Sequence, residues 1–172
     1  MPGNYDIVFL GDSITARFNT SEFFSDYCTV NRGIGSDTSE GVLNRLGEVE
    51  EHKPNKIFLM IGINDLANNI EKDTIVKNVS NIVLDVREKL PETEIYIESI
   101  LPSKDVKLNE IDKVNCEYKK IAEKYDNIIY IDLYSHFIDN NEMISKYYSS
   151  DGTHLTGDGY STVVKLISPY LK

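Results

Sequence analysis

The sequence predicts an α/β fold, a three-layer α/β/α sandwich around a parallel sheet of about five strands. Four runs are apolar at consecutive positions, as in strands buried on both faces, instead of alternating with polar residues. Segments with helical periodicity separate these runs, which favours a parallel sheet with right-handed crossovers and helices on both faces. With 172 residues, 41% of them hydrophobic, the chain is long enough for one domain, residues 1–172, with a substantial core.

The predicted strands and helices alternate along the chain without repeats or linkers. The four apolar runs cover residues 7–10, 57–61, 95–101 and 128–131, and a shorter candidate strand covers residues 28–30. Apolar residues recur with helical spacing in segments 42–49, 75–90, 111–125 and 160–171. The last of these amphipathic helices closes the chain.

Charge and composition exclude several function classes. The net charge of −10 repels nucleic acid and anionic lipid, and no cluster of Lys and Arg forms a local basic patch, so we expect no nucleic-acid partner and no stable membrane association. The chain reaches its first strand by about Tyr5, without a signal peptide or transmembrane run, so we expect a cytoplasmic protein unless a leader was removed. Cys28 and Cys116 are too few for a disulfide framework and are expected to be free, buried thiols.

Small and polar residues follow every predicted strand. Gly11-Asp12-Ser13 follows the first strand, and segments 31–38, 62–65 and 101–103 follow the next three. The last strand leads into a longer irregular region and then segment 150–155. Ligands of open α/β sheets bind in the crevice outside the carboxyl ends of the strands, so these segments form the candidate site. Each segment also contains the turn-forming residues of an ordinary α/β loop.

Ser13 is the candidate nucleophile, because its hydroxyl lies where a buried strand ends and a helix begins. The alternative is that Ser13 only caps the helix, since Ser and Asp are preferred N-cap residues. A serine nucleophile needs a base within hydrogen-bond reach, and that base needs an orienting group. The histidines of the chain therefore decide between the two interpretations.

The three histidines differ in their surroundings. His52 lies at a charged helix end and is expected to face solvent, and His136 is a weaker candidate. His154 follows Asp151 by three residues in a glycine-containing loop. A carboxylate in that position can accept the Nδ1–H of the imidazole and leave Nε2 as an acceptor. His154 is the candidate base and Asp151 its orienting group; the alternative is a surface histidine on a loop.

Acyl transfer also needs hydrogen-bond donors around the oxyanion of the tetrahedral intermediate. The backbone N–H of Ser13 is one candidate, and the glycine-rich loop 31–38 supplies a second backbone N–H. The Asn64 side-chain amide, after the third predicted strand (residues 57–61), is a further candidate. Taken alone, Asn64-Asp65 is better explained as an ordinary Asx turn or helix cap.

Together these segments resemble the four motifs of the SGNH hydrolases, the GDSL-type esterases and lipases. Gly11-Asp12-Ser13 is similar to the nucleophile block, with Ile14 where many members have leucine. Segments 31–38, 62–65 and 151–155 resemble the glycine, asparagine and Asp-x-x-His blocks in the same order and spacing. The likeness is greatest to small bacterial acylhydrolases akin to platelet-activating-factor acetylhydrolase and lysophospholipase-like esterases. It implies a flavodoxin-like sheet, a Ser13–His154–Asp151 triad, and neither metal nor cofactor.

One position departs from the family pattern. The oxyanion glycine of the family directly precedes an Asp-Thr pair, and this chain has Ser36 there, with Gly33 and Gly35 offset. A serine keeps the backbone N–H but adds a Cβ and restricts φ. By resemblance, Ser36 is expected to donate its backbone N–H to the oxyanion, beside Ser13 and Asn64.

These observations predict a serine esterase that removes a short acyl group, such as acetyl, from a small alcohol such as a sugar. The site lies at loop ends of an open sheet, and the sequence has no lid-sized insertion and no amphipathic anchor, which disfavours long-chain lipase action at an interface. A lysophospholipase or thioesterase of the same family is the alternative activity. The expected partner is therefore a small-molecule ester; the sequence has no signal of oligomeric state.

Two further interpretations come from other function classes. A non-catalytic carbohydrate-binding module on the same fold is disfavoured by the intact Ser13, Asn64, Asp151 and His154. A phosphate or flavin binder is disfavoured because the Asp12 carboxylate would repel phosphate. An acidic metal-dependent receiver would need a second carboxylate beside Asp12.

Overall fold

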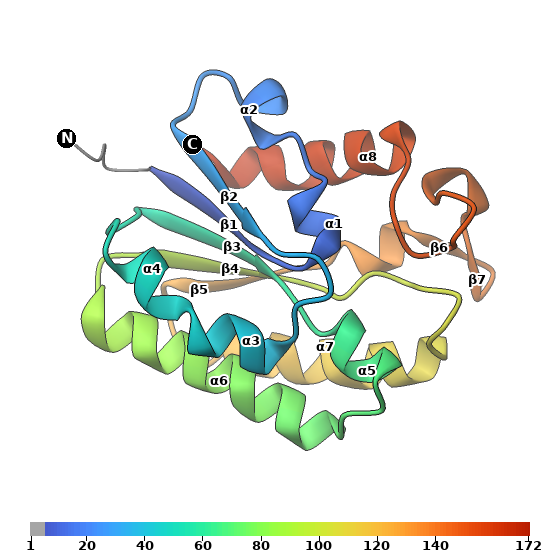
Figure 1. The fold of residues 1–172 in the computed structure, drawn as a ribbon, viewed down its shortest axis with the longest axis horizontal. Coiled ribbons are helices and arrows are strands. Elements are labelled where there is room, and N and C mark those ends of the chain that lie inside the picture. Colours follow the sequence, from blue (N-terminus) through green and yellow to red (C-terminus); the bar gives the residue numbers. More distant parts are fainter. Residues whose placement is uncertain (1–5) are drawn as a thin grey trace.

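The computed structural model describes residues 6–172, in which five parallel strands form a sheet between two layers of helices (Figure 1). The strands are β1 (Ile7–Gly11), β2 (Thr29–Gly33), β3 (Lys56–Met60), β4 (Glu94–Glu98) and β5 (Ile128–Ile131). They lie in the order β2-β1-β3-β4-β5. The predicted three-layer sandwich with a five-stranded parallel sheet is confirmed, and the carboxyl ends of all five strands meet at one edge.

The helices divide between the two faces of this sheet (Figure 1). One face is covered by α3 (Ser39–Asn44), α4 (Leu46–Glu50), α6 (Lys72–Lys89) and α7 (Leu108–Ala122), with α5 (Ile63–Ala67) against α7. The other face is covered by α1 (Ser13–Ala16), α2 (Thr20–Phe23) and α8 (Gly157–Ile167). Between β5 and α8 the chain forms three-residue helical turns, Tyr134–His136 and Ser145–Tyr147, and a hairpin of β6 (Ile138–Asp139) and β7 (Glu142–Met143). A last turn, Ser168–Tyr170, follows α8.

The two faces of the sheet bury separate hydrophobic cores. Successive side chains of a strand point to opposite faces, so Val8 and Leu10 pack in the core under α6 and α7, whereas Ile7 and Phe9 pack in the core under α8. Every residue of β1 is buried. A strand buried on both faces favours apolar side chains on both, which explains the unbroken apolar sequence of residues 7–10.

Several predicted boundaries differ from the structure. The short candidate strand at 28–30 extends to Gly33, because β2 pairs with β1 as far as Gly11 opposite Gly33. The predicted strand at 95–101 ends at Glu98, where its pairing with β5 ends. The helical segment 42–49 is split into α3 and α4 at Arg45, whose φ of −109° and ψ of 11° are not helical. Tyr5, where we expected the chain to reach its first strand, lies outside the described residues.

Two expectations about single side chains were wrong. Cys28 and Cys116 are free thiols, as predicted, but both are exposed: Cys28 directly precedes β2, and Cys116 lies in α7. His52 does not simply face solvent. It is half-buried, and its Nε2 lies 3.3 Å from Nη2 of Arg32 in β2.

Candidate active site

The nucleophile turn begins where β1 ends. Gly11 is the last residue of β1, and a Cβ there would lie 2.2 Å from the Met60 carbonyl oxygen, so only glycine fits. Asp12 caps α1, and its Oδ1 accepts the Ile14 N–H over 2.9 Å. Ser13 is the first residue of α1, so the predicted strand–helix junction is present. The capping role that Ser13 could have had belongs to Asp12.

Asn31 of β2 holds α1 in place. Its Nδ2 donates to the carbonyl oxygens of Thr15 and Phe18 over 2.7 and 2.8 Å, and its Oδ1 accepts the Gly33 N–H. A Cβ on Gly33 would lie 2.1 Å from the Ala16 backbone nitrogen. The segment that begins at Asn31 therefore positions the helix that presents Ser13.

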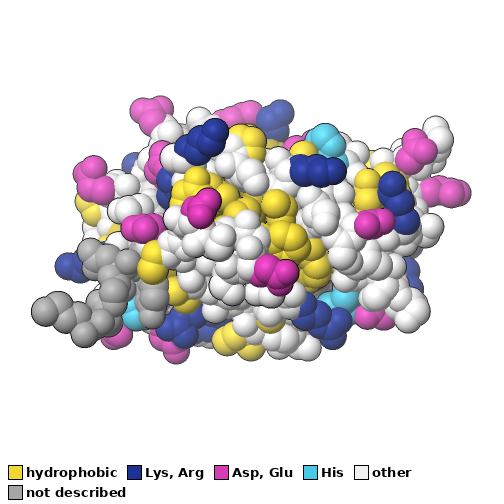
Figure 2. All heavy atoms as spheres, turned by 90° about the horizontal axis from the view of Figure 1, so that it is seen from above, with side chains coloured by type: hydrophobic (Ala, Val, Ile, Leu, Met, Phe, Trp, Pro, Cys, Tyr) yellow, Lys and Arg dark blue, Asp and Glu magenta, His cyan; other side chains and the backbone are white. Residues whose placement is uncertain are grey.

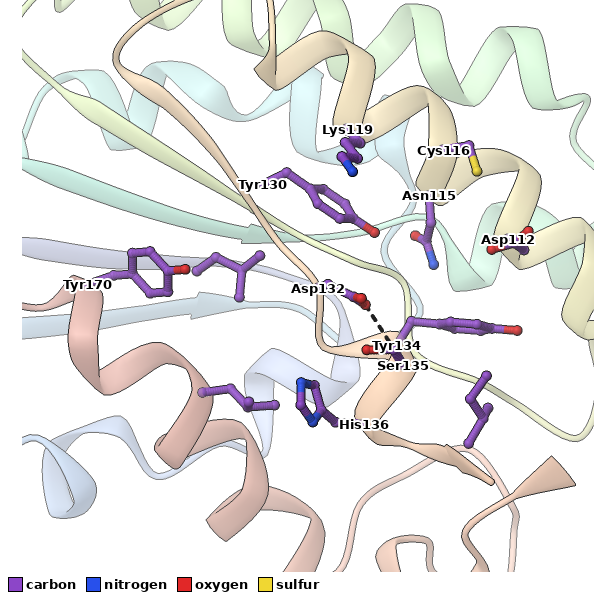
Figure 3. A pocket seen from close by; sticks show the side chains of 13 residues that line it. Asp112, Asn115, Cys116, Lys119, Tyr130, Asp132, Tyr134, Ser135, His136 and Tyr170 are labelled. Carbon is purple, nitrogen blue, oxygen red and sulfur yellow. Dashed lines mark hydrogen bonds between the residues drawn. The ribbon is translucent and has the colours of Figure 1, made fainter. Parts of the chain in front are cut away.

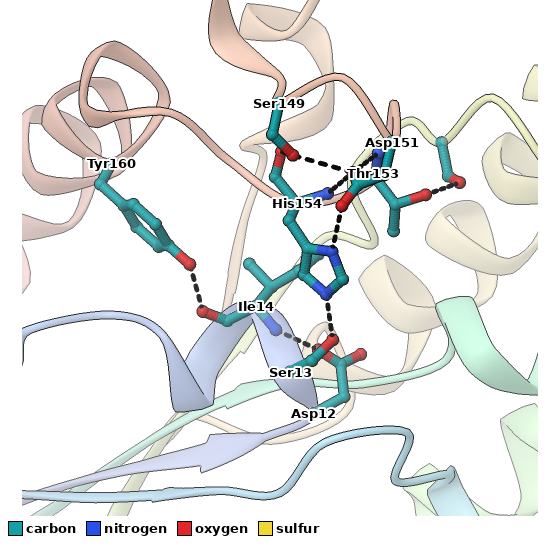
Figure 4. Close-up of polar contacts among 9 residues, drawn as sticks. Asp12, Ser13, Ile14, Ser149, Asp151, Thr153, His154 and Tyr160 are labelled. Carbon is teal, nitrogen blue, oxygen red and sulfur yellow. Dashed lines mark hydrogen bonds and ion pairs between the residues drawn. The ribbon is translucent and has the colours of Figure 1, made fainter.

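Ser13, His154 and Asp151 form a continuous hydrogen-bonded chain (Figure 4). His154 Nε2 lies 2.8 Å from Ser13 Oγ, and His154 Nδ1 lies 2.8 Å from Asp151 Oδ2. An ionised carboxylate can only accept, so Nδ1–H donates to Asp151 and Nε2 is left to accept the Ser13 hydroxyl. The imidazole is four-fifths buried, and the Asp151 side chain is half exposed. The structure brings together the three residues expected to form the triad.

The loop around Asp151 preorganises its carboxylate. Oδ1 accepts the backbone N–H groups of Thr153 and His154, each over 2.9 Å, and the Ser149 hydroxyl. These backbone donors, with the His154 side chain, hold the pKa of Asp151 well below its usual range. The lowered pKa favours the ionised form of Asp151. Gly152, with φ of +70°, makes the tight turn that returns the chain to His154.

The second loop contains a strained serine. Asp37 N–H donates to the Ile34 carbonyl over 3.2 Å, which closes a four-residue turn with Gly35 and Ser36 in its centre. Ser36 has φ of 61°, in the left-handed region that favours glycine at the third position of a type II turn. Glycine adopts this backbone conformation at lower cost, and the serine keeps a backbone N–H at the position.

Asn64 is oriented by the same loop. Its Nδ2 donates to the Asp37 carbonyl oxygen over 2.8 Å. The preceding Gly62 has φ of +125°, and a Cβ there would lie 2.8 Å from the Tyr118 hydroxyl. Asn64 is half-buried at the start of α5. The hydrogen bond to Asp37 therefore links Asn64, the predicted amide donor, to the loop of Ser36, the predicted backbone donor.

Three carboxylates, those of Asp12, Asp37 and Asp65, directly adjoin Ser13, Ser36 and Asn64 in the sequence. Asp65 is buried and satisfied: its oxygens accept the Ser39 N–H and the Ser39 hydroxyl. Asp12 is equally buried, but its Oδ2 has no hydrogen-bond partner. Burial, with smaller contributions from Asp37 and Asp65, raises the pKa of Asp12 to about 7. The sequence motifs contain Asp12 and Asp65 but carry no signal that these side chains are buried.

A cavity of about 700 Å³ lies away from this site, between α7, β5 and the end of α8 (Figure 3). His136 lines it, but the nearby Asp132 carboxylate accepts the Ser135 N–H. Ser13 and His154 do not line this cavity. Of the three histidines, His154 is thus the one that contacts Ser13. Within residues 6–172, no group of three His, Cys, Asp or Glu side chains is arranged to hold a metal ion, and no helix is long and apolar enough to cross a membrane.

Comparison with known proteins agrees with these observations. Residues 9–161 match the GDSL-like Lipase/Acylhydrolase family. The chain is 30% identical, over 175 residues, to platelet-activating factor acetylhydrolase IB subunit alpha2 of Rattus norvegicus, with 93% of this chain and 73% of that protein covered.

Solved structures are similar over almost the whole chain. A Streptococcus pneumonia protein, provisionally described as a platelet activating factor, superposes with a TM-score of 0.88 at 28% identity, covering 98% of this chain and 85% of its own. The family 3 carbohydrate esterase of Clostridium thermocellum superposes with a TM-score of 0.78, covering 97% of this chain and 96% of its own. Its identity of 18% makes that likeness one of fold alone.

Proposed function

The chain belongs to the GDSL-like lipase/acylhydrolase family and is an ester-hydrolysing enzyme, and from this premise we propose that it removes a short acyl group from a small alcohol by a Ser–His–Asp mechanism. The observation that supports this most strongly is the position of His154, 2.8 Å from both Ser13 Oγ and Asp151 Oδ2. We take residues 1–172 as one hydrolase domain, since the triad joins both ends of the chain.

In this mechanism His154 Nε2 takes the proton of the Ser13 hydroxyl as Oγ attacks the ester carbonyl. Asp151 keeps the imidazole in the required tautomer and stabilises the imidazolium that forms. The imidazolium then gives its proton to the departing alcohol, which leaves an acyl group on Ser13. Water, deprotonated by the same imidazole, attacks this acyl-enzyme and releases the acid.

The oxyanion of each tetrahedral intermediate needs preset donors. We assign this role to the backbone N–H groups of Ser13 and Ser36 and to the Asn64 amide. One amide N–H of Asn64 is used by the Asp37 carbonyl, and the second is the one assigned to the substrate. No metal or cofactor has a part in these steps.

We propose acetyl as the acyl group and a sugar as the alcohol. The relative's name, an acetylhydrolase, supports the acetyl group. Lysophospholipid or thioester hydrolysis is the alternative, with a cytoplasmic location expected in either case.

The direct test compares hydrolysis of p-nitrophenyl acetate, butyrate and octanoate by wild type and Ser13→Ala. We expect activity to be highest on acetate, to vanish in Ser13→Ala and to be unaffected by a chelator. Activity that persists in a folded Ser13→Ala variant would overturn the serine mechanism. Preference for octanoate would overturn the short-acyl assignment. If acetate is preferred, a panel of O-acetylated sugars identifies the alcohol.

A further inference from the structure

Arg45, at the break between α3 and α4, contacts two segments of the site. Its Nε lies 2.8 Å from Asp37 Oδ2, and its Nη2 donates to the Gly11 carbonyl oxygen over 3.1 Å. Gly11 lies two residues before Ser13, and Asp37 directly follows Ser36. One planar guanidinium therefore joins the strand end before the nucleophile to the loop of the second backbone donor.

Asp37 extends this connection to the third donor. Its carbonyl oxygen accepts the Asn64 amide over 2.8 Å, and its Oδ1 accepts the Thr38 N–H over 3.0 Å. Gly41 of α3 leaves the space that the carboxylate fills, since a Cβ at Gly41 would lie 1.8 Å from Asp37 Oδ1. The carboxylate is thus held through both oxygens, and the main chain of Asp37 orients Asn64.

The ion pair is well shielded from solvent. The side chains of Arg45 and Asp37 are 13% and 11% exposed, whereas ion pairs at the surface are screened and contribute little. A charge-assisted pair in such surroundings has a defined geometry that a mobile surface pair lacks. The non-helical φ and ψ of Arg45 separate α3 from α4 at this point.

We propose that Arg45 is a positioning residue of the oxyanion hole, which holds the Ser13, Ser36 and Asn64 donors in register through Gly11 and Asp37. This inference rests on the proposed function. Arg45 does not touch the reacting atoms. Its cationic charge also lies beside Asp37, one of the carboxylates whose negative charge would disfavour an oxyanion nearby.

The first test is Arg45→Lys, which keeps the charge but loses the planar fork that makes both contacts. We expect kcat on p-nitrophenyl acetate to fall by about 10- to 100-fold with little change in KM, because small displacements of catalytic groups have effects of this size. The pH profile should keep its shape, because His154 and Asp151 belong to another loop. The matched control is Lys89→Ala. It breaks the ion pairs of Lys89 to Glu50 and Asp85 at the C-terminal end of α6 and should leave kcat unchanged.

A second variant separates positioning from folding. Arg45→Ala leaves a space of guanidinium shape, and millimolar guanidinium is expected to restore part of its kcat, whereas equal concentrations of urea are not. Unchanged kcat in Arg45→Lys, an equal loss in Lys89→Ala, or the absence of rescue in a folded Arg45→Ala variant would each overturn the proposal. The proposed function fails separately, if wild type hydrolyses no ester or Ser13→Ala keeps its activity.

Discussion

Ser36 has a backbone conformation that glycine adopts at lower cost. Its φ of 61° lies in the left-handed region, which costs a residue with a Cβ about 1–2 kcal/mol. We expect Ser36→Gly to retain activity, because the backbone N–H remains, and to leave the free energy of unfolding unchanged or raise it by up to about 1 kcal/mol, since glycine also gains entropy in the unfolded chain. Urea unfolding and p-nitrophenyl acetate turnover measure the two effects. A collapse of kcat would show that the Ser36 hydroxyl takes part in the reaction.

Asn64 is the side-chain donor of the proposed oxyanion hole. Removing one such donor lowers kcat by about 10²–10³ in serine hydrolases, and Asn64→Ala is expected to fall in this range while KM changes little. The same substitution also breaks the hydrogen bond to the Asp37 carbonyl. Asn78→Ala is the matched control, since Asn78 donates to the Ser39 hydroxyl of the adjoining network. Wild-type turnover by Asn64→Ala would refute the assignment.

Glu98 is a fully buried carboxyl group at the end of β4, and burial raises its pKa from 4.5 to about 8. Between pH 4.5 and about pH 8, Glu98 therefore binds more protons in the folded state than in the unfolded state. The free energy of unfolding therefore falls as pH rises through this window, by at most about 1.4 kcal/mol per pH unit. Below pH 4.5 the stabilisation is fully present, and above pH 8 no further loss comes from this group.

Glu98→Gln should remove this dependence, because the amide does not ionise. Wild type and Glu98→Gln should differ most clearly in the pH dependence of the free energy of unfolding between pH 7 and 8. Asp12 contributes a similar pH dependence only below this range. Urea unfolding across this range measures it, with the exposed Glu92→Gln as control. Parallel stability curves for wild type and Glu98→Gln would show that Glu98 is not buried as a neutral acid.

Among the elements, the loop between the turn Ser145–Tyr147 and α8 determines the alignment of the proposed base. Ser149 N–H donates to the His154 carbonyl, and Gly152 N–H donates to the Ser149 carbonyl, so the loop closes on itself. Lys104 N–H donates to the Gly152 carbonyl and ties the loop to the segment after β4. The geometry of the proposed triad therefore depends on a turn that needs a glycine.

Gly152→Ala is expected to lower both stability and kcat. Its φ of +70° strains any residue with a Cβ, and that Cβ would lie 2.6 Å from Lys104 Cδ. The strain displaces Asp151 relative to His154, so kcat should fall at least tenfold at roughly 1–2 kcal/mol lower stability. The control is Gly157→Ala at the start of α8, where a Cβ meets nothing within 4 Å. Equal kcat values for the two variants would contradict the proposed role of the loop.

The elements that the sequence predicted are those with a strong local signal. Buried parallel strands leave unbroken apolar runs, and α6 and α7 leave a clear helical period. The split at Arg45 was missed because its flanking apolar residues keep the helical period across the break. The hairpin of β6 and β7 has two residues in each strand, too few for an alternating pattern.

At the scale of the whole molecule, the parallel sheet explains why a motif-based prediction of the site was possible. All five strands end at one edge, so residues 141 positions apart, Ser13 and His154, come within 2.8 Å. The Arg45–Asp37 contact had no such signal, since it depends on the angle at which α3 leaves the loop. The burial of Glu98 was equally invisible, because Glu98 lies inside the predicted run 95–101 and the sequence does not distinguish a buried glutamate there from an exposed one.

Surface charge fits a small-molecule substrate. The face over α2 and α8 shows acidic and basic side chains interspersed around a strip of apolar side chains (Figure 2), and the net charge is −10. Neither feature forms the single-signed basic surface that nucleic acid or anionic lipid needs. The esters used in the assays above are neutral and avoid this repulsion.

The most direct test of the central claim is to trap the acyl-enzyme. Wild-type protein is mixed with p-nitrophenyl acetate, quenched with acid within the first turnover, digested and examined by mass spectrometry. We predict one acetyl group, on the Ser13 hydroxyl, and none in His154→Ala, which lacks the base. Product formation without acetylation of Ser13, or acetylation at another residue that kinetically precedes turnover, would contradict the mechanism.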